Sequence, residues 1–278
     1  MTIQTAFSAR LARRTYRKVP EITVYFWIVK LLTTAMGEST SDYLVYHINP
    51  YVAVVFGCVG LIAALVLQFA VRRYVAWVYW LAVAMVAIFG TMAADVMHVV
   101  LGIPYLVSTT FFAIALTGVF ATWYAGEKTL SIHSIDTGRR ELFYWATIMA
   151  TFALGTAAGD MTAATLGLGY FPSLVLFAVL FAVPGLAYWL FGLNEIVAFW
   201  FAYVVTRPLG ASFADWTGKP YLGGLGLGDG KIALVLTIVI IGAVGYLTVT
   251  RTDTTSKHQE HALPESEAGV APVSPPNG

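Results

Sequence analysis

Four aspartates occupy the same position in a pattern that the chain repeats four times. In each copy an aromatic residue precedes a tryptophan, a glycine follows ten residues after the tryptophan, and an aspartate follows five residues later. The aspartates are Asp42, Asp95, Asp160 and Asp215. Carboxylates in apolar segments are costly and face a bundle interior or water, and acidic rings attract cations. The spacing therefore predicts an outward-facing, cation-attracting set of carboxylates.

A simpler interpretation is that each aspartate only lies at the water-exposed outer end of its helix. Asp42 and Asp215, which lie close to predicted helix boundaries, fit this interpretation best. However, the C-terminus of a helix carries a partial negative charge that disfavours aspartate. Helix capping therefore does not explain four acids at one register.

Glu38 adds a second carboxylate one helical turn before Asp42, on nearly the same face. Two such groups supply oxygen ligands for a hard cation or form a proton relay. The equivalent residues in the other copies are Thr91, Thr156 and Ala211. Because Glu38 breaks the repeat symmetry, repeat 1 is the predicted functional centre.

A metal site is a narrower hypothesis on the same residues. His98 follows Asp95 by three residues, so the two side chains share a helix face. The alternative for His98 is a solvated histidine at the outer edge. The set predicted on this basis is Asp42, Glu38, Asp95 and His98.

Basic residues also fall inside the apolar segments. Arg207 stands in the middle of the seventh segment, directly before Pro208, which removes a helix hydrogen bond and favours a kink. Its guanidinium is expected to bond freed carbonyls or to pair with a repeat-1 carboxylate, and a purely structural ion pair is the alternative. Lys30 precedes Glu38 by eight residues, or two four-residue steps. On an ideal α-helix, side chains four residues apart are rotated about the helix axis by about 40°. Lys30 and Asp42 therefore need not line one cavity.

Apolar helices must position these residues. Of 278 residues, 58% are hydrophobic and 11% are charged, with a net charge of +1, which excludes a disordered chain, a nucleic-acid binder and an ordinary soluble enzyme. About 20 apolar residues make a membrane-spanning helix. Eight stretches qualify, which predicts an all-α integral membrane protein: 21–45, 50–71, 74–100, 105–125, 141–165, 170–191, 195–216 and 231–250.

Charge asymmetry predicts the orientation. Residues 1–20 form a basic arm, expected to be retained in the cytoplasm, and basic residues recur near 72 and near 139, on the same side. The positive-inside rule then places both termini in the cytoplasm of a bacterium, with the protein in the inner membrane. Lys219 and Lys231, in the last outer loop, are the exceptions. The polar, proline-containing tail, 251–278, is expected to be disordered.

The repeat itself predicts the architecture. Each copy combines a motif-bearing helix with a plainer one, over about 21–72, 74–126, 140–192 and 194–250. Two-helix units preserve direction, so the copies are parallel repeats in one pseudo-symmetric bundle. The glycines allow close helix approach, and the register of the tryptophans favours packing between repeats over a ligand cage. These residues are Trp27, Trp80, Trp145, Trp200, Gly37, Gly90, Gly155 and Gly210.

The pattern resembles a bacterial family of membrane-anchored proteins built from four tandem two-helix repeats, each with a characteristic tryptophan. The stretch KVPEITVYFWIVKLLTTAMGESTSDYL is similar to the start of that family, and the resemblance runs from Lys18 to about residue 250. It implies a fold and a membrane location. The function of the repeat is unknown, so the resemblance supplies no binding or catalytic residues.

The favoured function is a transporter or channel for a small inorganic cation in the lipid bilayer, either a hard divalent ion or a proton-coupled substrate. Its pathway would use Asp42, Asp95, Asp160, Asp215, Glu38 and Arg207. The second hypothesis is a non-transporting sensor or assembly protein whose intramembrane charges are structural. A third is a membrane enzyme that uses the aspartates on a lipid-borne substrate. No zinc, haem or hydrolase motif supports an enzyme or identifies a cofactor.

Overall fold

The computed structural model of the protein describes residues 18–253. The predicted basic arm up to residue 17 and the predicted tail after residue 253 lie outside this range. Within it the fold is all-helical, without strands, which confirms the predicted fold class. The eight α-helices are α2 (Val24–His47), α3 (Pro50–Ala70), α4 (Ala76–Asp95), α5 (Tyr105–Glu127), α6 (Gly138–Asp160), α7 (Tyr170–Phe191), α8 (Glu195–Gly218) and α9 (Asp229–Thr250).

Short polar residues set several of the helix starts. Thr23, Asn49, Thr137 and Asn194 each accept a hydrogen bond from a backbone N–H in the first turn of the helix that follows. Such caps satisfy donors that the helix itself leaves unpaired. Pro50, the first residue of α3, lacks an N–H and fits this position for the same reason.

Seven of the helices in the described range are long and apolar enough to cross a membrane. The remaining helix, α2, has 24 residues but carries Lys30, Glu38 and Asp42 along its length. All three side chains are buried, because α2 packs against α4, α8 and α9. The charged side chains of α2 are therefore enclosed by the surrounding helices.

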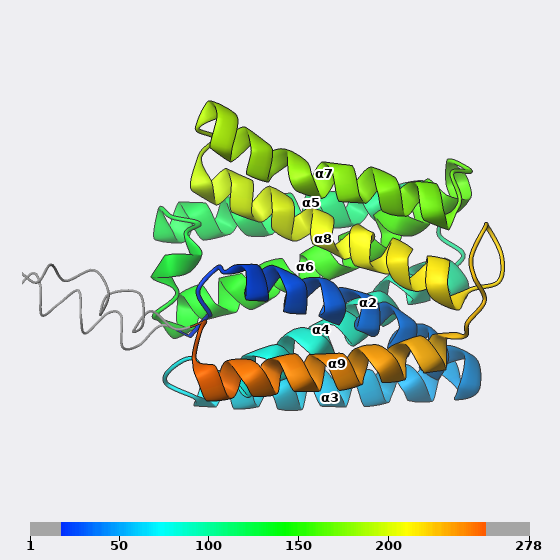
Figure 1. The fold of residues 1–278 in the computed structure, drawn as a ribbon, viewed down its shortest axis with the longest axis horizontal. Coiled ribbons are helices and arrows are strands. Elements are labelled where there is room, and N and C mark those ends of the chain that lie inside the picture. The colour runs from blue at the N-terminus through cyan, green and yellow to red at the C-terminus, as the bar shows by residue number, and fades with distance from the viewer. Residues whose placement is uncertain (1–17, 254–278) are drawn as a thin grey trace, which may run out of the picture.

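The four motif-bearing helices form an inner ring. α2, α4, α6 and α8 contact one another in that order, and α8 contacts α2 again. Each outer helix packs mainly on the inner helix of the next repeat, so that α3 lies on α4, α5 on α6 and α7 on α8. α9, orange in Figure 1, lies beside α2 and completes the series. The last helix of the described range therefore packs on the first, as each other outer helix packs on the inner helix of the next repeat.

The motif glycines lie at the contacts between successive inner helices. A Cβ added at each glycine would overlap the residue seven positions after the tryptophan of the next repeat. The pairs are Gly37 with Ala87, Gly90 with Phe152, Gly155 with Arg207 and Gly210 with Thr34. Small residues let membrane helices approach closely. The same contact therefore recurs around the ring.

We expect Gly90→Val to lower the free energy of unfolding by about 1–3 kcal/mol, the usual cost of overpacking. The added Cβ would lie 2.7 Å from the Cβ of Phe152 across the contact between α4 and α6. Gly118→Val on α5, where no atom lies within 4 Å, is the matched control. Denaturant unfolding in detergent micelles measures both variants, and equal stability would show that α4 and α6 do not require this close approach.

The motif tryptophans form an aromatic layer around the same ring. The aromatic residue before each tryptophan contacts the tryptophan of the next repeat, with ring centroids 5.7–6.3 Å apart. The pairs are Phe26–Trp80, Tyr79–Trp145, Tyr144–Trp200 and Phe199–Trp27. Aromatic pairs at these distances stabilise a packed core. The tryptophans therefore lie between repeats, in a closed layer of rings.

This aromatic layer lies toward the end of the bundle where the described chain begins and ends, which we call the terminal end. There the Glu21 N–H donates to the Asp253 carbonyl at 3.0 Å. The Lys18 ammonium lies 2.6 Å from the Glu141 carboxylate, to which Gln68 also donates. The opposite end carries the four motif aspartates, and we call it the acidic end. The loop from α8 to α9 closes it, at the right of Figure 1.

Candidate cation site at the acidic end

Three carboxylates converge near the acidic end. One oxygen from each of Glu38, Asp42 and Asp215 lies within 4.8 Å of the other two, and all three side chains are buried. We call these residues the carboxylate cluster. They come from the first and fourth repeats, which are neighbours because the ring closes between α8 and α2. This spacing is suitable for ligands of a single hard cation.

Asp95 and Asp160 lie around the cluster rather than in it. Both interact electrostatically with Glu38 and Asp42, but both are partly exposed at the ends of α4 and α6. A π-helical turn follows each of them, η1 (Val96–Val100) and η3 (Met161–Thr165). α2 and α8 continue as regular α-helix past Asp42 and Asp215. The four equivalent aspartates are therefore divided into a buried pair and a partly exposed pair.

Lys219 places its own cation in the cluster. Its ammonium lies 2.7 Å from an Asp215 oxygen and 2.9 Å from an Asp42 oxygen. Burial disfavours the charged form of this lysine, but the carboxylates of Asp215 and Asp42 outweigh burial and hold the pKa of Lys219 above its usual range. The cluster therefore already binds an ammonium group that belongs to the chain.

From the sequence, Lys219 is only an exception to the charge asymmetry, and no contact with the aspartates is predicted for it. Its position four residues after Asp215, a spacing at which helical side chains meet, could have predicted that contact. The loop fixes it further, because its backbone N–H groups donate to the carbonyls of Trp216, Thr217, Gly218 and Lys219. Position 224 must be glycine, since a Cβ at Gly224 would overlap the Lys219 carbonyl.

A second polar layer lies one turn deeper, around Arg207. Its guanidinium is fully buried and lies 2.7 Å from the Glu38 carboxylate. It also donates to the hydroxyls of Thr91 and Thr156 and, at 3.2 Å, to the Thr34 carbonyl. Thr91 and Thr156 are the repeat equivalents of Glu38, so the side chains at one position of the pattern, from three different repeats, all contact the arginine. Arg207 thus pairs with a repeat-1 carboxylate, one of the two partners considered for it.

Pro208 does not end the helix. α8 continues through it from Glu195 to Gly218. The proline ring packs at the contact between α6 and α8, where its Cδ would lie 3.0 Å from a Cβ at Gly155. Arg207 is thereby held at a close helix contact.

His98 does not join the carboxylate cluster. One ring nitrogen lies 2.8 Å from the Ile103 carbonyl, and the other lies 3.1 Å from the Ser108 hydroxyl. The ring also packs on Tyr105 at a centroid distance of 3.9 Å. The four-residue metal set expected from the sequence is therefore not assembled as such. In the described chain the group with metal-ligand spacing is Glu38, Asp42 and Asp215.

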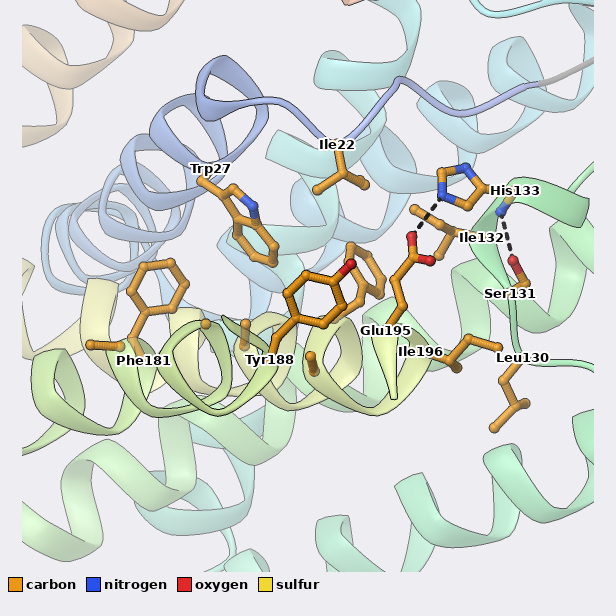
Figure 2. A pocket seen from close by; sticks show the side chains of 15 residues that line it. Ile22, Trp27, Leu130, Ser131, Ile132, His133, Phe181, Tyr188, Glu195 and Ile196 are labelled. Carbon is orange, nitrogen blue, oxygen red and sulfur yellow. Dashed lines mark hydrogen bonds and ion pairs between the residues drawn. The ribbon is translucent and has the colours of Figure 1, made fainter. Parts of the chain in front are cut away.

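A separate cavity of about 440 Å³ lies toward the terminal end, between the start of α2, the loop at 130–133, α7 and α8. Figure 2 shows Trp27, Phe181 and Tyr188 around it, with His133 and Glu195 joined at one side. Its lining is mostly apolar, and of the residues in the repeat pattern it contains Trp27 and Phe199, the aromatic residue before Trp200. Converging oxygen ligands are found at the acidic end, so the candidate cation site is placed there.

Comparison with known proteins identifies the repeat. Segments 25–74, 78–129, 143–193 and 198–253 each match the model of one family, described as a Repeat of Unknown Function (DUF347). No curated protein and no solved structure is similar enough to this chain to match it. The four matches cover most of the chain and include all four motif aspartates, so the protein is a member of this four-repeat membrane family.

Proposed function

We propose that the protein is a membrane transporter for a cation, which binds at Glu38, Asp42 and Asp215. The observation that carries the proposal is that one oxygen from each of these three buried carboxylates lies within 4.8 Å of the other two, and that Asp42 and Asp215 already hold the Lys219 ammonium. Oxygen ligands without sulfur or imidazole favour a hard ion. A divalent cation is therefore the proposed substrate, and Asp95 and Asp160 attract it from the acidic end.

The closed aromatic layer favours a transporter over a channel. Phe26, Tyr79 and Tyr144 are at most 1% exposed and lie between the carboxylate cluster and the terminal end. A substrate that reaches the cluster from the acidic end therefore has no open route past these rings. Passage requires a second conformation in which they separate, as in alternating access.

The proposed orientation follows from the charges at the two ends. Exposed basic residues at the terminal end lie in loops and at the start of α6, and they are Arg72, Arg73, Lys128 and Arg139. At the acidic end, the Lys219 charge is neutralised by Asp42 and Asp215. The positive-inside rule then places the terminal end in the cytoplasm of a bacterial inner membrane. The acidic end faces outward.

Ion flux in proteoliposomes tests the proposal, with a panel of divalent cations outside and a pH-sensitive dye inside. We expect flux of at least one cation, lost when Asp42, Asp95, Asp160 and Asp215 are all changed to asparagine. Asp136→Asn is the matched control, because this aspartate pairs with Arg140 at the terminal end. Absence of flux and of binding for every cation would refute the proposal, as would full flux in the quadruple variant.

A non-transporting sensor or assembly protein is the second candidate, and one observation favours it. The Arg207 guanidinium donates to Glu38, Thr91 and Thr156, so its charge is paired within the chain without a substrate. Buried charges require such partners whatever the function. Saturable cation binding in detergent together with no flux in proteoliposomes would select this candidate.

A further inference from the structure

Lys30 is buried on the bundle axis without an anionic partner. Its side chain is fully buried, and its ammonium nitrogen has no hydrogen-bond partner among the residues that the structure describes. It lies 4.2 Å from the ring centroids of both Phe152 and Tyr203. A buried ammonium is costly unless it is paired, whereas the neutral amine of lysine is tolerated. This site therefore favours a lysine that exchanges a proton.

Hydroxyl groups connect the surroundings of Lys30 with the terminal end. The Tyr203 hydroxyl is buried and interacts electrostatically with Tyr79 and Tyr144. Tyr79 and Tyr144 share a hydrogen bond of 2.5 Å. The Tyr74 ring packs on Tyr79 at 5.7 Å, and its hydroxyl donates to the Asp253 carboxylate. Tyr203, Tyr144, Tyr79 and Tyr74 therefore follow one another through the aromatic layer, and we call them the tyrosine line.

Asp253 ends this line outside the helices. Burial raises the pKa of its carboxyl, and the hydrogen bond from Tyr74 opposes the rise. A carboxyl with this shift holds a proton more readily than an exposed aspartate does. It is therefore suited to pass protons between water at the terminal end and the tyrosines.

Arg207 connects Lys30 with the carboxylate cluster. Its guanidinium carbon lies 5.0 Å from the Phe152 ring centroid, so the two cations share one ring. α9 presents only apolar buried residues to the bundle. The other helices around Lys30 carry titratable or charged groups, namely Tyr79 on α4, Tyr144 on α6, and Tyr203 and Arg207 on α8. On α2 itself the corresponding group is Glu38.

We propose that Lys30 is the proton-binding site of the transporter and that the tyrosine line connects it to the terminal end. The Lys30 nitrogen has no hydrogen-bond partner in the described structure, so the transfer takes place when the aromatic rings separate and a tyrosine hydroxyl reaches the amine. The hydroxyl then gives its proton to the amine and takes another from its neighbour. The tyrosines are unchanged after each transfer, and the net proton comes from water at the terminal end. This inference rests on the proposed cation transport and adds proton exchange to it.

Charge repulsion couples the two sites. Eight residues of helix separate Lys30 from Glu38, a rise of about 12 Å. At an effective dielectric constant of about 20, two positive charges at that distance weaken each other's binding about tenfold. Cation binding at the cluster therefore releases the Lys30 proton, and proton binding releases the cation. The proposed cycle exchanges a cation for a proton.

The experiment measures cation affinity in detergent and opposed proton movement in proteoliposomes. We expect Lys30→Met to retain cation binding and to lose the opposed proton movement. Lys30→Arg, which keeps a permanent charge, should hold cation affinity about tenfold lower than Lys30→Met. Tyr144→Phe should slow proton movement at least about tenfold with cation affinity unchanged. Tyr124→Phe, an exposed tyrosine on α5, is the matched control, and thermal unfolding verifies that each variant is folded.

The outcomes separate this inference from the proposed function. Cation flux without opposed proton movement in the natural protein would overturn the role of Lys30 and leave the transporter intact. Unchanged proton movement in folded Lys30→Met would do the same. Absence of cation binding and flux in the natural protein would overturn both proposals together.

Discussion

Lys219→Met is expected to bind a divalent cation at least about tenfold more tightly than the natural protein. A substrate cation must displace the Lys219 ammonium from the Asp42 and Asp215 oxygens, which lie 2.9 Å and 2.7 Å away. A charge pair about 4 Å apart contributes about 4 kcal/mol at an effective dielectric constant of about 20. Methionine has a similar length and carries no charge. The two carboxylates are then left without their internal cation, and a substrate ion replaces it.

Calorimetric titration of the purified protein in detergent measures this change. Lys231→Met is the matched control, because Lys231 lies at the same end of the bundle but is exposed, near the start of α9. It should change cation affinity little, since exposed charges are screened by salt. Equal affinities for the two variants would mean that the ammonium does not compete with the substrate. Lys219 would then be a structural link between α8 and the loop.

Arg207→Met is expected to lower the free energy of unfolding by about 3–5 kcal/mol, the typical cost of removing one partner of a buried ion pair. Glu38 would remain buried, at 2% exposure, without the guanidinium that lies 2.7 Å from its carboxylate. The hydroxyls of Thr91 and Thr156 would lose the donor they share. Denaturant unfolding in detergent micelles measures the loss.

The double variant Arg207→Met/Glu38→Met should recover most of that stability, because it removes the unpaired charge together with its partner. Arg139→Met gives the surface comparison: its side chain is 65% exposed, and its pair with Glu127 should contribute at most about 1 kcal/mol. If Arg207→Met costs no more than Arg139→Met, the buried pair does not stabilise the ring. Failure of the double variant to recover would assign the loss to packing around Phe152 instead.

The two predictions concern polar side chains at two depths inside the ring of α2, α4, α6 and α8. Positions three, seven, eleven and fifteen residues after each motif tryptophan lie at successive levels along the inner ring, from the aromatic layer to the acidic end. Lys30 belongs to the first layer, Arg207 to the second, Glu38 to the third and the aspartates to the fourth. Acids dominate the acidic end, and the cations Lys30 and Arg207 lie deeper, whereas Lys219 and the exposed Lys231 lie at the acidic end itself. A cation that enters from the acidic end therefore meets attraction first and repulsion at Arg207.

The local features of this protein could be predicted from its sequence. Helix positions follow from the length of apolar runs, and the residues bounding α3 and α8 agree with the predicted spans within two residues. The repeat predicted parallel two-helix units, and a glycine at a fixed offset predicted close helix contacts. These properties depend on residues near one another in the chain, so a single sequence contains them.

The tertiary structure alone decided which repeats meet. Asp42 and Asp215 are 173 residues apart, and they share a site because α9 and α8 return the chain to α2. His98 does not act as a ligand with Asp95, because the Ile103 carbonyl in the loop after α4 and the Ser108 hydroxyl on α5 contact its two ring nitrogens. Lys219 joined the cluster because its loop folds back on α8. Sequence spacing fixes the face of a helix that a side chain occupies, but the partner on that face depends on how all eight helices pack.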